Sequence, residues 1–125
     1  NLGIAFQIQD DILDCYGDEA LVGKQPGGDI IQNKKTLLLI EAIKRSSIKN
    51  DGRLLEWISK KEFNNTEKLN DFLSIFNDYD IKPFALQQRD AYVQKSVHAL
   101  ESISLDEPKK AVLKSLVDYL VLRDF

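Results

Sequence analysis

Three aspartates lie within five residues near the start of the chain, in the segment Asp10-Asp11-Ile12-Leu13-Asp14. On an α-helix, Asp10 and Asp14 are one turn apart, displaced by roughly 6 Å along the axis. Both carboxylates can therefore face one cavity, while Asp11 points elsewhere. Two hard oxygen ligands on one face suit Mg²⁺, which takes few protein carboxylates and completes its shell with water and phosphate oxygens. The alternative is a solvated acidic helix face, but apolar residues surround these acids and favour a metal site.

The segment after the three acids supplies the opposite charge. Gly23 and Lys24 place a cation in an expected loop, and Gly27-Gly28-Asp29 provides backbone that can approach a ligand closely. Lys34 and Lys35 are expected in the first turn of the next helix. Cations there oppose the helix dipole, which is a mild energetic cost that an anion bound nearby would offset. Lysines near helix starts are mostly solvated, so the inference depends on the combination. Acids for a metal and lysines for phosphate together predict a metal-bridged polyphosphate site.

The hydrophobic periodicity predicts the helices that must position these groups. A first helix is expected to end near Tyr16-Gly17, and a loop is expected over 17–33. Five further helices are expected, over 34–45, over 52–61, from a cap at Thr66, over 83–103 and from Pro108 onward. Expected core positions include Leu54, Leu55, Ile58, Phe72, Phe76, Val112, Leu116 and Val117. No segment alternates with a period of two, so the predicted fold class is all-α, with one domain over 1–125.

The composition limits the classes of function. A chain of 125 residues that is 43% hydrophobic can form one packed domain. A net charge of -3, with both signs mixed along the sequence, argues against binding to nucleic acid. The single cysteine, Cys15, cannot form an internal disulfide, and no apolar run is long enough to span a membrane. We therefore expect a cytoplasmic protein that is not embedded in a membrane and binds no nucleic acid.

Taken together, these motifs resemble the trans-isoprenyl diphosphate synthases, the polyprenyl synthetase family that includes farnesyl and geranylgeranyl diphosphate synthases. The segment from Phe6 to Asp14 is similar to the second aspartate-rich motif of that family. The string that follows it is matched by Gly23-Lys24, Gly28-Asp29-Ile30 and Asn33-Lys34. The resemblance is concentrated between Gly3 and Leu39, and it implies the C-terminal helices of an isoprenoid-synthase-type helical bundle.

The resemblance also implies a reaction. An allylic diphosphate would be condensed with isopentenyl diphosphate after Mg²⁺ and lysines stabilise the charge on the departing diphosphate. No side chain would act as a nucleophile or as an acid or base. The implied metal ligands are Asp10 and Asp14. The implied substrate-binding residues are Lys24 and Lys34 on the allylic diphosphate, Asp29 acting through water, Gln7 near the substrate and Phe6 against the isopentenyl group.

Other parts of the family's site are missing from these 125 residues. They include the first aspartate-rich motif and the basic residues that bind isopentenyl diphosphate. We therefore expect the C-terminal part of an enzyme that is a homodimer when complete, and a fragment that is inactive alone. Three alternatives stay open: a terpene cyclase, a non-catalytic regulatory subunit and a plain helical interaction module. The three aspartates of Asp10-Asp11-Ile12-Leu13-Asp14, followed by Gly23-Lys24, argue against the cyclase, and the retained acids argue against the subunit.

Overall fold

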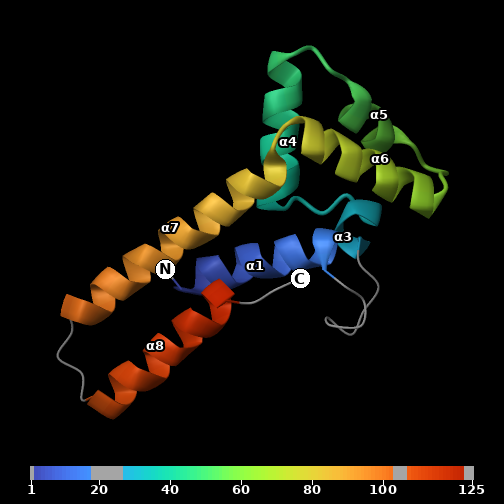
Figure 1. The fold of residues 1–125 in the computed structure, drawn as a ribbon. Coiled ribbons are helices and arrows are strands. Elements are labelled where there is room, and N and C mark those ends of the chain that lie inside the picture. The colour runs from blue at the N-terminus through green and yellow to red at the C-terminus, as the bar shows by residue number, and fades with distance from the viewer. Residues whose placement is uncertain (1, 18–26, 103–106, 123–125) are drawn as a thin grey trace.

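The computed structural model describes residues 2–17, 27–102 and 107–122, and all regular structure in these ranges is helical. The helices are α1 (Leu2–Tyr16), α3 (Gly28–Ile31), α4 (Leu37–Ile48), α5 (Arg53–Ser59), α6 (Asn65–Asp78), α7 (Ile81–Ser102) and α8 (Glu107–Leu122) (Figure 1). The predicted all-α class is confirmed. No helix in the described ranges is both long enough and apolar enough to cross a membrane.

Two groups of helices meet along α1. The long helix α7 lies beside α1, and α8 contacts both of them (Figure 1). Helices α4, α5 and α6 pack together at the C-terminal end of α1. The short helix α3 joins these groups because it contacts both α1 and α6. Helix α1, which carries the three aspartates, therefore lies at the centre of the fold.

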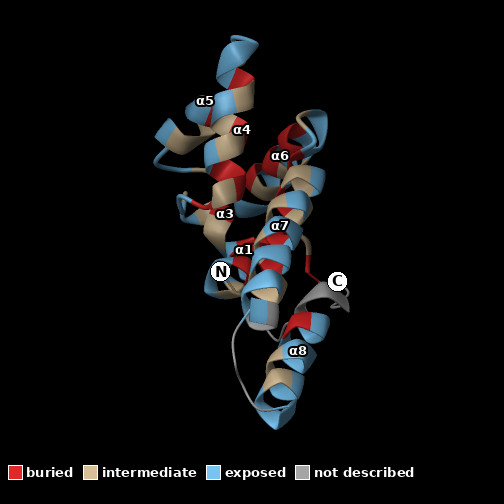
Figure 2. Ribbon diagram, turned by 90° about the vertical axis from the view of Figure 1, so that its left-hand side faces the viewer, coloured by how far each residue is buried: buried red, intermediate tan, exposed pale blue. Residues whose placement is uncertain are grey.

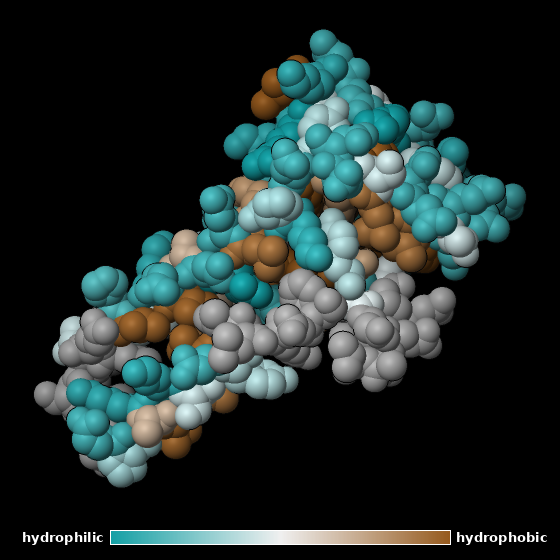
Figure 3. All heavy atoms as spheres, viewed as in Figure 1, coloured by the Kyte–Doolittle hydropathy of each residue, from teal (hydrophilic) through white to brown (hydrophobic). Residues whose placement is uncertain are grey.

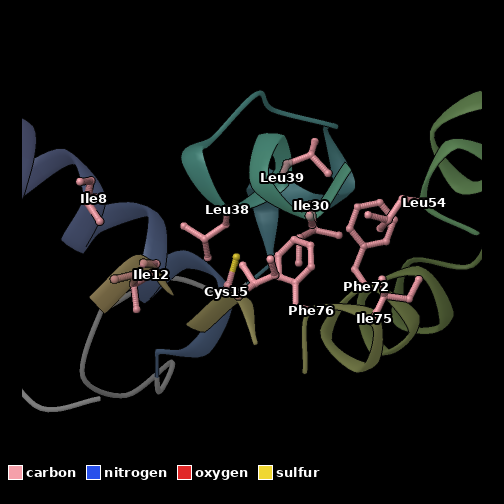
Figure 4. Close-up of a cluster of buried hydrophobic side chains, with 13 residues drawn as sticks. Ile8, Ile12, Cys15, Ile30, Leu38, Leu39, Leu54, Phe72, Ile75 and Phe76 are labelled. Atoms are coloured by element: carbon pink, nitrogen blue, oxygen red, sulfur yellow. The ribbon is translucent and has the colours of Figure 1, made fainter. Parts of the chain in front are cut away.

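The hydrophobic core follows this arrangement. Its main cluster lies where α1, α3, α4 and α6 meet. Figure 4 labels these of its side chains: Ile8, Ile12, Cys15, Ile30, Leu38, Leu39, Leu54, Phe72, Ile75 and Phe76. A second, smaller cluster joins α1, α7 and α8 through Ala5, Val93 and Val117. Burial is concentrated in α1, α4, α6 and the adjoining part of α7, whereas α8 is exposed along most of its described length (Figure 2). Burial of this apolar surface is the main driving force for the fold.

Two helix starts differ from the prediction. Helix α4 begins at Leu37 because the Thr36 hydroxyl accepts a hydrogen bond from the Leu39 backbone N–H at 3.2 Å. This cap leaves Lys34 and Lys35 before the helix, so their placement in its first turn was wrong. Helix α6 is capped by the Asn64 side chain, not by Thr66. In addition, the loop expected over 17–33 contains the short helix α3, which raises the number of helices in the described ranges from the expected six to seven.

Several apolar residues expected in the core lie on the surface. Leu55 is 54% exposed, Val112 is 62% exposed and Leu116 is 42% exposed. Their neighbours Leu54 and Val117 are buried, so each helix turns one face toward the described core and the other toward solvent. In the face shown in Figure 3, hydrophobic side chains are also visible between α7 and α8.

Candidate functional site

The three aspartates of α1 lie in different environments. Asp10 is exposed, whereas Asp11 is 5% exposed and Asp14 is 3% exposed. The difference arises because α1 is covered on several sides, by α3, α4, α7 and α8. We expected Asp10 and Asp14 to face one cavity while Asp11 pointed elsewhere. In the structure it is Asp11 that lines a cavity, whereas Asp14 is buried against α3.

Asp14 connects α1 to α3. Its Oδ2 accepts a hydrogen bond from the Asp29 backbone N–H at 2.8 Å, and its backbone carbonyl accepts one from the Gly27 N–H. Gly27 has a φ of +96°, and a Cβ at this position would lie 2.7 Å from Cδ1 of Leu69. Only glycine fits there without strain. Gly27 therefore allows the start of α3 to lie close to Leu69 of α6, and Asp14 fixes the position of Asp29.

A cavity of about 560 Å³ lies between α1, the 34–37 segment and α7. Its lining residues are Gly3, Ile4, Gln7, Ile8, Asp11, Lys34, Lys35, Thr36, Leu37, Gln88 and Tyr92. Inside it, Gln7 Nε2 donates a hydrogen bond to Asp11 Oδ1 at 3.0 Å. Burial raises the pKa of Asp11, while the hydrogen bond from Gln7 and the charge of Lys34 act in the opposite direction. The cavity thus combines apolar walls with one acid and two lysines.

Lys34 lies between the cavity and α3. Its Nζ is 3.8 Å from Asp29 Oδ1, and its side chain is 52% exposed. Its backbone N–H donates to the Asp29 carbonyl at 2.9 Å, which closes the turn after α3. The structure thus brings together Gln7, Asp29 and Lys34 of the predicted site, with Asp11 in addition. An ammonium group that is half exposed beside a cavity can bind an anion.

The other predicted residues lie elsewhere. Phe6 is half-buried and packs against the small cluster between α1, α7 and α8, so it is not part of the cavity lining. Lys24 lies outside the described residues. Within the described ranges, no group of three or more His, Cys, Asp and Glu side chains converges. The exposed carboxylate of Asp10 suits an ion such as Mg²⁺, which uses one or two protein carboxylates and takes its other ligands from water and phosphates.

Two buried cationic side chains, Arg89 and Lys68, were not predicted from the sequence. Arg89 of α7 is 7% exposed, and its Nη1 donates to Gln9 Oε1 at 2.8 Å, directly beside the acidic segment. Lys68 of α6 is fully buried and contacts the turn between Asp29 and Lys34. Both contacts join residues far apart in the chain, so spacing within one helix gives no signal for them.

Comparison with known proteins identifies the class to which this helical protein belongs. Residues 1–76, more than half of the chain, match the polyprenyl synthetase family. The chain therefore belongs to the polyprenyl synthetase family.

Three of the curated relatives come from archaea. The chain is 32% identical over 124 residues to a short chain isoprenyl diphosphate synthase of Methanothermobacter thermautotrophicus. It is 34% identical over 122 residues to a geranylgeranyl pyrophosphate synthase of Geoglobus acetivorans and 34% identical over 124 residues to a geranylfarnesyl diphosphate synthase of Aeropyrum pernix. These alignments cover 98% of this chain but only 37%, 35% and 37% of the respective relatives. The chain thus spans little more than a third of their length.

Proposed function

We propose that this chain forms the metal–diphosphate part of a trans-isoprenyl diphosphate synthase. In this proposal the intact, naturally encoded protein condenses an allylic diphosphate with isopentenyl diphosphate. The observation that carries the proposal is the cavity beside α1, where apolar walls lead to Asp11 and the two lysines. An isoprenoid diphosphate has the matching chemistry, because an apolar chain is joined to an anionic head. The family membership and the names of the relatives support the same reaction.

Mg²⁺ is the proposed cofactor. When bound, it would supply positive charge that stabilises the departing diphosphate and so favours ionisation of the allylic carbon–oxygen bond. Asp10 is the proposed direct ligand, since its exposed carboxylate can reach an ion without breaking a contact that holds the fold. Asp14 is proposed to assist through water while its Oδ2 keeps its hydrogen bond to the Asp29 backbone.

The remaining residues bind and orient the substrates in this proposal. Lys34 and Lys24 contact the allylic diphosphate, and Asp29 orders water beside it while its carboxylate keeps the Lys34 ammonium in place. Gln7 lies near the bound substrate, on the cavity wall. Phe6 is proposed to pack against the isopentenyl group. We further propose that residues 1–125 form one domain and that the intact protein is a cytoplasmic homodimer.

The proposed substrate can be tested by calorimetric titration of the intact protein with an allylic diphosphate. Because the site is proposed to bind the diphosphate through metal ions, affinity should be high with Mg²⁺ and should fall sharply when EDTA removes it. The corresponding allylic alcohol serves as the control, and it should bind weakly under both conditions. Equal affinity for the alcohol and the diphosphate would contradict the proposal. So would an affinity for the diphosphate that is the same with and without Mg²⁺.

Replacement of Lys24 by alanine should weaken the use of the allylic substrate. Loss of a charge-assisted contact costs on the order of 1.5–3 kcal/mol, so kcat/KM for the allylic diphosphate should fall about ten- to a hundred-fold. Lys44→Ala is a suitable control because Lys44 is exposed on α4, away from the cavity. Steady-state kinetics with varied allylic substrate give the answer. If Lys24→Ala changes neither the rate nor the allylic KM, the proposed role of Lys24 is wrong.

A further inference from the structure

The fully buried side chain of Lys68 has an unusual environment. Its Nζ donates to Asn33 Oδ1 at 2.6 Å and to the Ile31 backbone carbonyl at 3.3 Å. The same ammonium lies 4.3 Å from the ring centroid of Phe63 and 5.6 Å from that of Phe72. No ion pair described in the structure includes Lys68. A cation is therefore held in the core by neutral acceptors and aromatic faces.

Burial of a charged side chain is energetically costly, and the need to fill this volume does not explain why a lysine occupies it. Removal of an ammonium from water is unfavourable, and here it lowers the pKa of Lys68. The two hydrogen bonds and the cation–π contacts offset part of this cost. A methionine could fill a similar volume between Phe63 and Phe72 without any charge to desolvate. Unlike methionine, the lysine donates directed hydrogen bonds to two oxygen atoms.

Both oxygen atoms belong to the turn that links Asp29 to Lys34. Ile31 is the last residue of α3, and Asn33 has a φ of +54°, in the left-handed region. The turn is closed by the hydrogen bond from the Lys34 N–H to the Asp29 carbonyl. Lys68 holds this turn from α6. Asp14 holds the start of α3 from α1, so the short helix is fixed at both ends.

We propose that Lys68 is a positioning residue, which holds the 31–33 turn through the Ile31 carbonyl and the Asn33 side chain and thereby places Asp29 and Lys34 for diphosphate binding. The identity of the ligand rests on the proposed function, whereas the contact of Lys68 with Ile31 and Asn33 is independent of it. Lys68 does not touch the substrate in this account, because its ammonium is enclosed by α6 and the turn.

The test replaces Lys68 by methionine in the intact protein, with Lys60→Met as a matched control. Lys60 also lies over an aromatic ring, that of Trp57, but it is exposed and contacts no part of the turn. We expect Lys68→Met to keep its thermal unfolding midpoint, because the charge is removed together with its desolvation cost. Its affinity for inorganic pyrophosphate with Mg²⁺ should fall about tenfold or more, because small displacements of binding groups have large effects. Lys60→Met should bind like the wild type.

Asn33→Ala removes one acceptor and keeps the amine, so it should reproduce the loss of affinity. The double variant should lose little more than either single variant, because both act through one contact. If Lys68→Met is folded and binds pyrophosphate as the wild type does, the proposal is overturned. If Lys68→Met fails to fold, Asn33→Ala decides the question, and unchanged affinity in that variant overturns the proposal.

Amide hydrogen exchange provides a readout that needs no ligand. Lys68→Met should increase exchange across residues 30–36, whereas Lys60→Met should not. Unchanged exchange in this segment would contradict the positioning role. If the wild type does not bind pyrophosphate with Mg²⁺, the proposed function fails, while the exchange experiment still decides whether Lys68 holds the turn.

Discussion

Replacement of Asp10 by alanine in the intact protein should lower turnover by at least roughly a hundred-fold. Removal of one electrostatic stabiliser of a transition state typically has an effect of this size. Asp10 is proposed to hold an ion that neutralises the departing diphosphate, so the loss should appear in kcat and not only in KM. Because Asp10 is exposed, the substitution should leave the fold intact. Steady-state condensation at saturating Mg²⁺ measures the effect, and circular dichroism checks the fold.

Two further variants make this result specific to Asp10. Asp118→Ala removes an exposed aspartate from α8 and should retain full turnover. Asp14→Ala should lower turnover less than Asp10→Ala but should also destabilise the protein, since Asp14 is buried and holds α3 through the Asp29 backbone. Near-native turnover in a folded Asp10→Ala protein would mean that the acidic cluster is structural.

Of the variants discussed, replacement of Phe72 by alanine should cause the largest decrease in the free energy of unfolding. Phe72 is fully buried in the main core, and its ring centroid lies 6.0 Å from that of Phe76. A Phe-to-Ala change in a core removes apolar contacts and leaves a cavity, which lowers the free energy of unfolding by about 3–5 kcal/mol. Urea unfolding of the intact protein, followed by circular dichroism, gives the difference.

Leu55→Ala is the control for Phe72→Ala. Leu55 is 54% exposed on α5, so its truncation should change the free energy of unfolding by about 0.5 kcal/mol or less. A similar loss of stability in the two variants would contradict the described arrangement of α5 and α6 around the core.

The sequence predicted those parts of the fold that depend on local periodicity. Helix α1 ends at Tyr16, as expected, and Phe72 and Phe76 lie buried on one face of α6. These predictions were correct because a helix in contact with a core must carry apolar residues every three or four positions. Periodicity does not show whether another helix covers a given apolar face. Leu55 and Val112 were therefore predicted to be buried, although both are exposed.

The site was predicted in composition more than in geometry. The acids and lysines were recognised as one group, and Gln7, Asp29 and Lys34 do lie around one region of the structure. The rotation of α1 was not predictable from the spacing of its acids, because it depends on contacts with α3 and α7. The sequence interpretation therefore gave Asp11 no place in a site, although Asp11 lines the cavity between α1 and α7. Lys68 was missed for the same reason, since its partners lie 35 and 37 residues away in the chain.

The most direct test of the proposed prenyl transfer is a condensation assay of the intact protein. An allylic diphosphate and isotope-labelled isopentenyl diphosphate are incubated with saturating Mg²⁺, and the products are separated by chain length. We expect a labelled diphosphate that is longer by five-carbon units, together with release of inorganic diphosphate. Addition of EDTA should abolish both. Folded protein that releases diphosphate without incorporating label would instead indicate a cyclase, and folded protein that does neither would contradict the proposed activity.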